Sequence, residues 1–489
     1  MLFFRPVIFA ALALTALCTP LFAQADAPAS PCRVSGIKTG VLCGVISVPL
    51  NPEAATGQRI DVHYVVVPAL ARRKQPDPVF YLAGGPGQSA IRLAGQVAQQ
   101  MTRLNNRRDL VFVDQRGTGQ SAPLMCDEDR NSTLAQQLDL QRRGALLRQC
   151  LRQLQQLPYG DLRYFTTTIA MQDVNAVRQA LGAERINLVA GSYGTRAALE
   201  YQRQFPQTVR RTILDGVAPP DVALPASIST DNQSAFESAL AACEQEAICS
   251  KTYPGLRAHW KALLESLPRT ALLADPLTGV AERLTLTREM LLGAVRAPLY
   301  VPVMASALPQ AITEAAQGRF EALLGLGSMF NARGLDRLAM GMHFSVVCAE
   351  DMPRLANSPD QAGADFGLEF TQFYRSTCAY WPRGVVPAGF YAIAPSATAV
   401  LLLSGGLDPV TPPRHGERVA QALGAKARHL VVPHAGHGVM SLACMRDVLF
   451  RFIDAEDDAA ANAVDASCAK NIPRPPGFVP VARVTEAAS

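Results

Sequence analysis

A serine flanked by small residues lies near the middle of the sequence. Ser192 belongs to the segment Ala190-Gly191-Ser192-Tyr193-Gly194, which follows an apolar run and precedes a segment of helix-forming composition. A serine on a tight turn between a strand and a helix points its hydroxyl out of the sheet edge, and this strained turn needs small neighbours. The pentapeptide alone would also fit an ordinary turn, but its surroundings predict that Ser192 is a nucleophile.

A serine hydroxyl becomes nucleophilic when a base removes its proton, and the base needs a carboxylate to orient it. His437 lies between two glycines after a late apolar run, and Asp408 follows the apolar run before that one. The chain order is therefore serine, aspartate, histidine, which is the order of α/β-hydrolases and differs from the chymotrypsin and subtilisin orders. We predict a catalytic triad of Ser192, His437 and Asp408.

Two other interpretations of the histidines remain open at this point. His434 could be the base, but it follows Pro433 at the end of the apolar run, whereas His437 lies in the glycine-flanked loop. A metal site made of His429, His434 and His437 would lack an acidic partner at helical spacing. The triad is favoured, and neither a metal nor another cofactor is predicted.

Acyl transfer also needs two N–H donors for the tetrahedral oxyanion. One is expected from the amide of Tyr193, directly after the nucleophile. The other is expected from Gly85, in the Gly-Gly-Pro-Gly segment at 84–87, which follows an early apolar run. Glycine lets the backbone approach the substrate closely. This segment could be a plain turn, but a later serine turn of the type described makes an oxyanion loop the better interpretation.

The elements that must position these groups have the pattern of buried parallel strands alternating with helices. Short apolar runs that end in glycine-rich turns predict strands, and helices are expected at 169–181, 195–205 and 442–454. Chemistry in α/β sheets lies at the carboxyl ends of the strands, where these turns fall. The sequence therefore predicts an α/β-hydrolase fold, with a mostly parallel sheet flanked by helices. The predicted strands are 79–82, 110–113, 186–190, 212–214, 398–403 and 429–432.

This alternation stops between about 219 and 396, where the sequence becomes rich in helix patterns. We expect an inserted all-helical lid here, with helices at 234–242, 257–267, 288–295 and 306–321. The predicted organisation is a signal peptide at 1–25, a first core part at 26–218, the lid at 219–396 and a second core part at 397–489. The tail after Cys468 is expected to lie irregularly on the surface.

The amino terminus has the features of a secretory signal peptide. A positive region at 1–5 precedes an apolar region at 7–17 and a small-x-small site at 23–25, which predicts cleavage after Ala25, or alternatively after Ala23. Cleavage removes Cys18 and leaves ten cysteines, an even number that predicts a disulfide framework in an exported chain. Sequence does not fix the connectivity. Sequential pairing is the simplest, and scattered buried thiols are the alternative.

Composition excludes several other classes of protein. The 489 residues are 49% hydrophobic and 18% charged, with a net charge of +5. No apolar run is long enough for a polytopic membrane protein, and the aliphatic content is too high for a disordered chain. The basic residues form only short groups such as Arg72, Arg73 and Lys74, so a nucleic-acid surface is not expected. We expect a periplasmic or secreted protein with no membrane anchor after cleavage.

Several motifs together resemble the prolyl iminopeptidase and tripeptidyl aminopeptidase family of α/β-hydrolase serine peptidases. They are Gly-Gly-Pro-Gly at 84–87, Asp-Gln-Arg-Gly-Thr-Gly-Gln-Ser at 114–121, Gly-Ser-Tyr-Gly at 191–194, Asp-Pro-Val-Thr-Pro-Pro at 408–413 and Gly-His-Gly at 436–438. Ala83 stands where the family often has histidine, and Ala190 replaces the first glycine of the serine turn. Both departures favour the secreted tripeptidyl branch.

The resemblance implies cleavage of short peptides near a free amino terminus. Such an enzyme needs a carboxylate for the substrate ammonium, since charged hydrogen bonds contribute about 1.5 to 3 kcal/mol. Glu350 and Asp351 in the lid are the candidate substrate-binding residues, and a bridge from Cys348 to Cys378 would hold them rigidly. A solvated acidic turn is the alternative.

The sequence thus predicts an exported, monomeric serine exopeptidase that acts on short peptides with a free amino terminus and needs no cofactor. Two alternatives remain. One is a secreted esterase or lipase-like hydrolase, because the same triad serves both reactions. The other is an inactive peptide-binding protein on the same scaffold.

Overall fold

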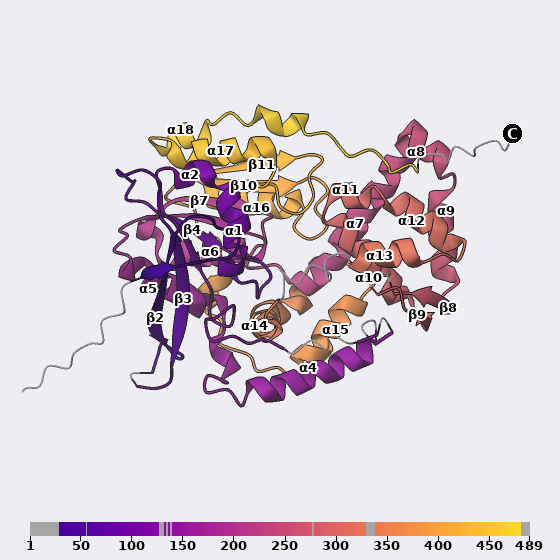
Figure 1. Cartoon of the computed structure of the whole chain (residues 1–489), viewed down its shortest axis with the longest axis horizontal. Helices are drawn as coiled ribbons and strands as arrows, with labels where there is room; N and C mark the ends of the chain where they lie inside the picture. The colour runs from indigo at the N-terminus through magenta and orange to yellow at the C-terminus, as the bar shows by residue number, and fades with distance from the viewer. Residues whose placement is uncertain are drawn as a thin grey trace, which may run out of the picture.

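The computed structural model describes residues 29–54, 56–126, 132–133, 135–136, 139–275, 278–328 and 338–480. The predicted signal peptide at 1–25 lies outside the described residues. Figure 1 shows a sheet-containing core on the left and a group of helices on the right.

Within the described residues, nine strands form one mixed sheet in the order β1-β2-β3-β5-β4-β6-β7-β10-β11. The first three strands pair antiparallel, and β3 pairs antiparallel with β5. From β5 onward all pairs are parallel. The mostly parallel sheet predicted from sequence is therefore confirmed. The strands are β1 Ser30–Cys32, β2 Val41–Pro49, β3 Arg59–Val67, β4 Val79–Leu82, β5 Leu110–Val113, β6 Ile186–Gly191, β7 Val209–Asp215, β10 Val400–Gly405 and β11 Ala427–Val432.

Helices cover both faces of the sheet because the central strands are apolar on both sides. Phe80, Leu188 and Leu214 pack on one face with α5 and α6, whereas Tyr81 and Val189 pack on the other with α1 and α17. The helices of the core are α1 Ala90–Gln100, α2 Thr102–Asn105, α4 Leu140–Leu154, α5 Thr167–Ala180, α6 Tyr193–Gln204, α16 Pro413–Leu423, α17 Ala443–Asp454 and α18 Asp458–Asn462.

The first part of the inserted segment has its own apolar core, which includes Phe236, Trp260 and Phe320. Its helices lie on the right of Figure 1. They are α7 Leu224–Gln245, α8 Ala247–Thr252, α9 Leu256–Glu265, α10 Arg288–Leu299, α11 Pro302–Ala305, α12 Leu308–Ala316 and α13 Glu321–Ser328.

The prediction of an all-helical lid is wrong at one place. Strands β8 (Arg269–Ala274) and β9 (Ala281–Leu286) form an antiparallel hairpin within the insertion. Leu273, Leu284 and Leu286 of this hairpin are buried, while most of its other residues are exposed or half-buried. One-sided alternation of this kind is typical of an antiparallel hairpin on a helical layer.

The second part of the insertion packs against the sheet-containing core instead. It contains α14 (Met340–Val346), a π-helical turn (Val347–Asp351) and α15 (Glu369–Cys378). Met342, Phe344 and Trp381 are buried in the same apolar cluster as the central strands. The insertion therefore consists of a module with its own core and a segment that is continuous with the main core.

Among the described residues, the ten cysteines form five disulfides, and each cysteine pairs with its neighbour in sequence. The sequential pairing is confirmed. The bonds join Cys32 to Cys43, Cys126 to Cys150, Cys243 to Cys249, Cys348 to Cys378 and Cys444 to Cys468.

The carboxyl-terminal tail connects the core to the insertion. Beyond α18 it runs over the top of the molecule toward the helices on the right (Figure 1). Gly477 N donates to a carboxylate oxygen of Glu246 at 2.9 Å, and Phe478 N donates to Ser306 O at 2.9 Å. The predicted irregular segment is thus bonded to the residues that directly follow α7 and α11.

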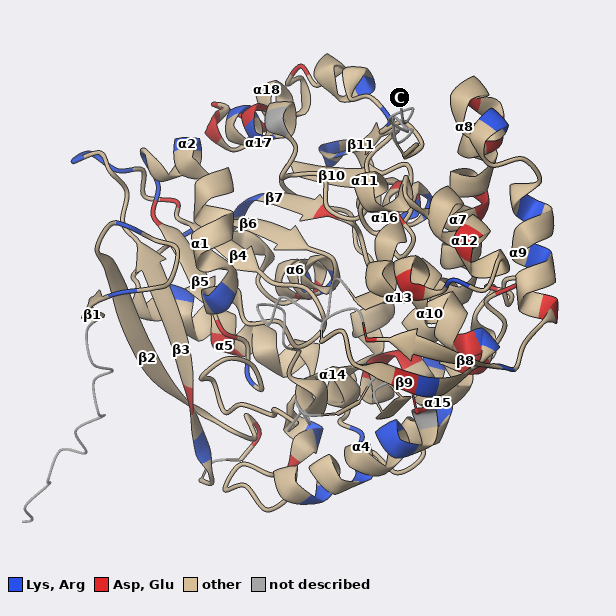
Figure 2. Cartoon of the chain, turned by 45° about the vertical axis from the view of Figure 1, so that its right-hand side comes forward, with Lys and Arg blue, Asp and Glu red and all other residues tan. Residues whose placement is uncertain are grey.

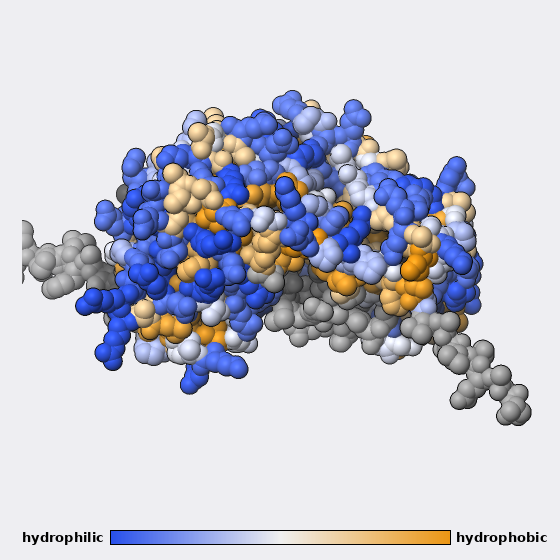
Figure 3. Space-filling view, turned by 90° about the horizontal axis from the view of Figure 1, so that it is seen from above, coloured by the Kyte–Doolittle hydropathy of each residue, from blue (hydrophilic) through white to orange (hydrophobic). Residues whose placement is uncertain are grey.

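Charged residues lie mostly on the outer helices, whereas the central strands carry few of them (Figure 2). The face seen from above is largely hydrophilic, with apolar side chains gathered toward its middle (Figure 3). No helix in the described part of the chain is long and apolar enough to cross a membrane.

Candidate active site

Ser192 occupies a strained turn between β6 and α6. Its φ and ψ angles are 54° and −126°, a left-handed conformation that costs a non-glycine residue about 1 to 3 kcal/mol. A Cβ on Gly194 would lie 2.2 Å from the carbonyl oxygen of Leu82, so glycine alone fits there. Ala190 is fully buried in the strand. The turn therefore has the geometry that the sequence predicts for a nucleophile.

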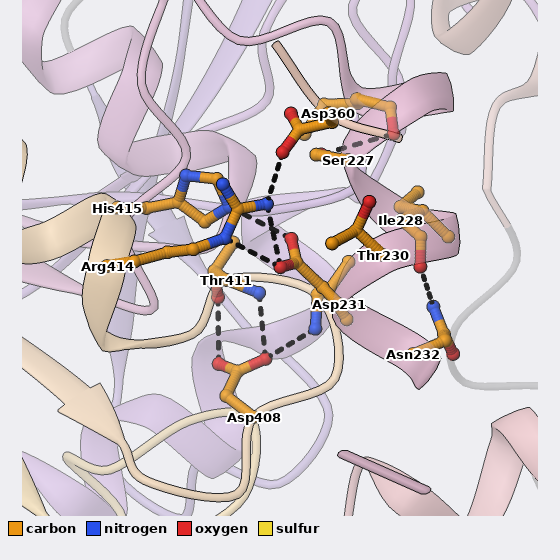
Figure 4. Close-up of polar contacts among 12 residues, drawn as sticks. Ser227, Ile228, Thr230, Asp231, Asn232, Asp360, Asp408, Thr411, Arg414 and His415 are labelled. Carbon is orange, nitrogen blue, oxygen red and sulfur yellow. Dashed lines mark hydrogen bonds and ion pairs between the residues drawn. The ribbon is translucent and has the colours of Figure 1, made fainter. Parts of the chain in front are cut away.

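His437 and Asp408 lie on neighbouring loops, after β11 and β10. His437 Nδ1 is 2.8 Å from Asp408 Oδ2. The other carboxylate oxygen, Oδ1, accepts hydrogen bonds from the amides of Val410 and Thr411, and the Thr411 hydroxyl donates to Oδ2 at 2.8 Å. Figure 4 shows Thr411 above the Asp408 carboxylate. The carboxylate is thus held where it can accept a hydrogen bond from the N–H at Nδ1 of His437. Nε2 is then the ring nitrogen that can face a substrate.

Electrostatics support the roles of this pair. Burial alone would lower the pKa of His437, but the charge of Asp408, the hydrogen bond to it and the charge of Asp215 together raise that pKa. Burial opposes ionisation of Asp408, yet His437 and the two backbone amides hold the pKa of Asp408 below its ordinary value. An ionised aspartate that stabilises an imidazolium is what a general base needs.

Asp215, at the end of β7, joins the serine turn to the histidine loop. Its carbonyl oxygen accepts a hydrogen bond from Ser192 N at 2.8 Å. Its carboxylate accepts bonds from Val439 N and Met440 N, each at 2.9 Å. Burial raises the pKa of Asp215 to about 6. Asp215 was not among the predicted site residues, although a carboxylate at the end of the strand beside the Ser192 strand is a signal for such a position.

The glycine segment at 84–87 lies against the serine turn. A Cβ on Gly84 would lie 3.1 Å from the Cβ of Ser192. Gly85 has a φ of 111°, which favours glycine. Tyr193 begins α6 and is buried, and its hydroxyl is 2.6 Å from the Thr167 hydroxyl. The segments of both predicted oxyanion donors therefore meet beside Ser192, and the assignment of Gly85 and Tyr193 as donors stays a prediction.

The motif at 114–121 makes polar contacts with the start of α1 and with α5. Asp114 accepts hydrogen bonds from the Ser89 hydroxyl at 2.6 Å and from Ile91 N at 3.1 Å, so it fixes the start of α1 just after the glycine segment. Arg116 is buried and makes a bidentate pair with Asp173 of α5, at 2.6 and 2.7 Å. In the sequence this motif indicated a family resemblance. In the structure its Asp114 and Arg116 hold the start of α1 and the helix α5 in place.

Glu350 and Asp351 lie in a buried cluster around Arg196. Both oxygens of Asp351 pair with Arg196, at 2.9 and 3.1 Å, and one also accepts from Leu224 N. Glu350 accepts from the Thr167 amide at 2.8 Å and the Thr167 hydroxyl at 2.9 Å. Burial raises the pKa of Glu350 to about 7, against the lowering effect of Arg196 and Thr167. The acidic turn is therefore not solvated, and neither carboxyl lies on an open surface.

Contacts from the insertion reach the catalytic loops. His437 N donates to Tyr300 O at 2.9 Å, and the Tyr300 ring packs edge-on against the imidazole at 5.3 Å between centroids. Near the Asp408 loop, Asp231 of α7 pairs with His415 at 2.9 Å and with Arg414 at 2.8 Å (Figure 4). The insertion is thus bonded to the loop that carries His437 and to the helix that follows the Asp408 loop.

His434 and His429, which the sequence offered as an alternative base and as metal ligands, have different surroundings from His437. His434 lines a cleft of about 470 Å³ between α7, α11, the tail and the loop that holds Leu407. His429 is 2.9 Å from the hydroxyl of Ser404. In the described part of the chain, no group of three or more His, Cys, Asp or Glu residues is arranged to hold a metal ion.

Comparisons with known proteins show which proteins this chain is similar to. The serine protease Hip1 of Mycobacterium tuberculosis (strain H37Rv) is 26% identical over 432 residues, 81% of this chain and 82% of that protein. The tripeptidyl aminopeptidase of Streptomyces lividans is 28% identical over 193 residues, 37% of this chain and 36% of that protein. A solved proline iminopeptidase from Mycobacterium smegmatis has 14% identity and a TM-score of 0.34, and the match covers 86% of this chain and all of the other. The model of the alpha/beta hydrolase fold matches residues 77–442, so the chain belongs to the α/β-hydrolase family.

Proposed function

We propose that this protein is an exported serine exopeptidase that releases short peptides or single residues from free amino termini. The observation that carries the proposal is the catalytic arrangement: a strained Ser192 beside the glycine segment, with His437 held 2.8 Å from a buried Asp408. The relatives named as a serine protease and a tripeptidyl aminopeptidase support peptides as substrates, while another relative is named as a carboxylesterase.

In this mechanism Ser192 Oγ attacks the scissile carbonyl while His437 Nε2 takes its proton. Asp408 keeps the proton of the imidazole on Nδ1 and stabilises the imidazolium. The amides of Gly85 and Tyr193 bind the oxyanion of the tetrahedral intermediate. His437 then donates its proton to the leaving amine, and water hydrolyses the acyl-enzyme by the same steps in reverse order.

Glu350 is the carboxyl that we propose for the substrate ammonium. It lies in the insertion, and its partner Thr167 is bonded to the side chain of Tyr193, directly after the nucleophile. Because its oxygens already have protein partners, an incoming amine would have to displace one of them. Asp351 is saturated by Arg196 and Leu224, so its part in the proposal is to orient Arg196 beside Glu350.

Export is supported by the five disulfides, since such bonds persist in oxidising compartments. The inserted segment at 219–396, whose first part has its own core, would then act as a lid that admits small peptides and excludes folded proteins.

The test is a ladder assay on one peptide prepared with a free and with an acetylated amino terminus. We expect ordered amino-terminal fragments from the free peptide and none from the acetylated one, with Ser192→Ala as the inactive control. Cleavage of a small ester together with failure on both peptides would instead support the esterase alternative. A folded sample that neither cleaves nor reacts with a fluorophosphonate would support a binding protein.

The role of Glu350 is tested by Glu350→Gln. The variant should raise KM for free-amine peptides much more than for blocked esters. If KM rises equally for both substrates, Glu350 does not bind the substrate amine and instead helps to hold Tyr193 in place through Thr167.

A further inference from the structure

The oxyanion loop at 84–87 is held by an element of the insertion. Ala339, which precedes α14, donates its N–H to Gly87 O at 2.9 Å. A Cβ on Gly87 would lie 2.9 Å from Ala339 O. Since the two backbones touch directly, the position of the loop depends on the position of α14.

His343 of α14 makes the side-chain link to the same loop. Its ring is buried, with Nδ1 at 3.2 Å from Pro86 O and Nε2 at 2.7 Å from the Tyr374 hydroxyl. A carbonyl oxygen can only accept, so Nδ1 must carry the proton, and Nε2 then accepts from Tyr374. Burial lowers the pKa of His343 to about 4, so the ring stays neutral at physiological pH.

Tyr374 is itself fixed from several sides. Its ring packs against Phe370 at 4.9 Å and Phe344 at 5.5 Å between centroids. The disulfide between Cys348 and Cys378 ties the π-helical turn after α14 to the end of α15, which carries Tyr374. The Tyr374 hydroxyl, which is bonded to His343, is therefore held in a fixed position.

We propose that His343 is a positioning residue, which fixes the oxyanion loop through the carbonyl of Pro86 so that Gly85 N–H faces the developing oxyanion. His343 itself has no contact with reacting atoms. The inference deepens the proposed serine chemistry, since it concerns the acyl-transfer step at Ser192, but it does not depend on the kind of substrate.

Loss of this bond should act on the transition state more than on substrate binding, because the oxyanion forms only there. Misplacement of a catalytic group by about 1 Å can cost roughly 100-fold in rate. We therefore expect kcat to fall about 10- to 100-fold, with KM nearly unchanged.

The experiment compares three substitutions that separate the two ring nitrogens. In His343→Asn the amide can occupy the place of Nδ1 and keep the bond to Pro86. In His343→Gln it reaches the place of Nε2 and keeps only the bond to Tyr374, and His343→Leu loses both. His429→Asn, at the bond to Ser404, is the matched control. The readouts are kcat and KM on a small ester, the rate of fluorophosphonate labelling, and the thermal unfolding midpoint.

We expect the Gln and Leu variants to lose kcat and labelling rate together, while the Asn variant recovers most of both and the control is unchanged. Equal kcat in the Asn and Gln variants would overturn the proposal, as would rates that simply follow the folded fraction. Tyr374→Phe, which keeps the ring, provides a test if the Leu variant does not fold, and an unchanged kcat there would also count against the role. The labelling rate keeps this test separate from the peptidase proposal, because a wild-type protein that labels but cleaves no peptide would refute only the latter.

Discussion

Replacement of Asp215 by asparagine should make the protein more stable and less active at neutral pH. Burial raises the pKa of Asp215 to about 6 from its ordinary value of 3.8. Each pKa unit corresponds to about 1.4 kcal/mol, so holding this carboxylate ionised in the folded state costs roughly 3 kcal/mol above pH 6. Asparagine has nearly the same shape and avoids that cost.

The sign of the pH dependence follows from the raised pKa. A group whose pKa is higher in the folded state contributes its stabilisation below the unfolded value, here about pH 4, and loses it as the pH rises through about 6. The wild type should therefore lose stability relative to Asp215→Asn between pH 4 and pH 6. The difference should reach about 3 kcal/mol at pH 8. Urea unfolding of both proteins across this range measures it.

The same substitution should weaken the base. The charge of Asp215 contributes to the raised pKa of His437, so its removal should move the acidic limb of the kcat/KM profile to lower pH and reduce kcat. Asp61→Asn, at an exposed position of β3, is the matched control. A variant less stable than the wild type at pH 8 would refute the reasoning, because the hydrogen bonds to Val439 and Met440 would then outweigh the cost of the buried charge.

Three further outcomes follow from the site and its supports. Asp408→Asn should lower kcat by about 10⁴-fold with little change in KM, because His437 loses the acceptor for its Nδ1 proton. Steady-state kinetics on a small ester measure this effect, and a loss of kcat below about 10-fold would contradict the prediction. Gly194→Ala places a methyl group 2.2 Å from Leu82 O and should lower the free energy of unfolding by about 1 to 3 kcal/mol or more. An unchanged thermal unfolding midpoint would count against the described turn. Replacement of both Cys348 and Cys378 by serine removes a disulfide that spans a sequence separation of 30. The free energy of unfolding in urea should fall by about 3 to 4 kcal/mol, and a fall near zero would indicate that this disulfide does not restrain the unfolded chain.

The central strands and the turns of the triad were predictable because their signals are local. The central parallel strands contain short apolar runs, and the loops with Ser192, Asp408 and His437 come soon after such runs in the sequence. The antiparallel strands β2 and β3 were missed, since several of their residues are half-buried or exposed and their apolar pattern is broken. The β8–β9 hairpin escaped prediction for the same reason.

The environment of Glu350 and Asp351 could not be predicted from their sequence neighbours. Arg196, the partner of Asp351, is 155 residues away along the chain. An acidic dipeptide after a cysteine has the same appearance whether it is solvated or buried. Only the fold shows that the π-helical turn lies against α5 and α6, so that both carboxyls are buried beside a single arginine.

The insertion contacts the loops that carry the predicted catalytic residues, so we expect it to help position them. Tyr300 accepts a hydrogen bond from the amide of His437, His343 holds the carbonyl of Pro86, and Asp231 binds the helix that follows the Asp408 loop. A lid that only restricted access would leave small-ester turnover intact or increase it when shortened. Here, replacement of the α7–α13 module by a short linker should instead lower that turnover, because the histidine loop and α16 would lose their outer contacts. A fall in turnover would show that access and catalysis are coupled, whereas unchanged or higher turnover would show a lid that only restricts access, so a small-ester assay of the shortened chain distinguishes the two cases.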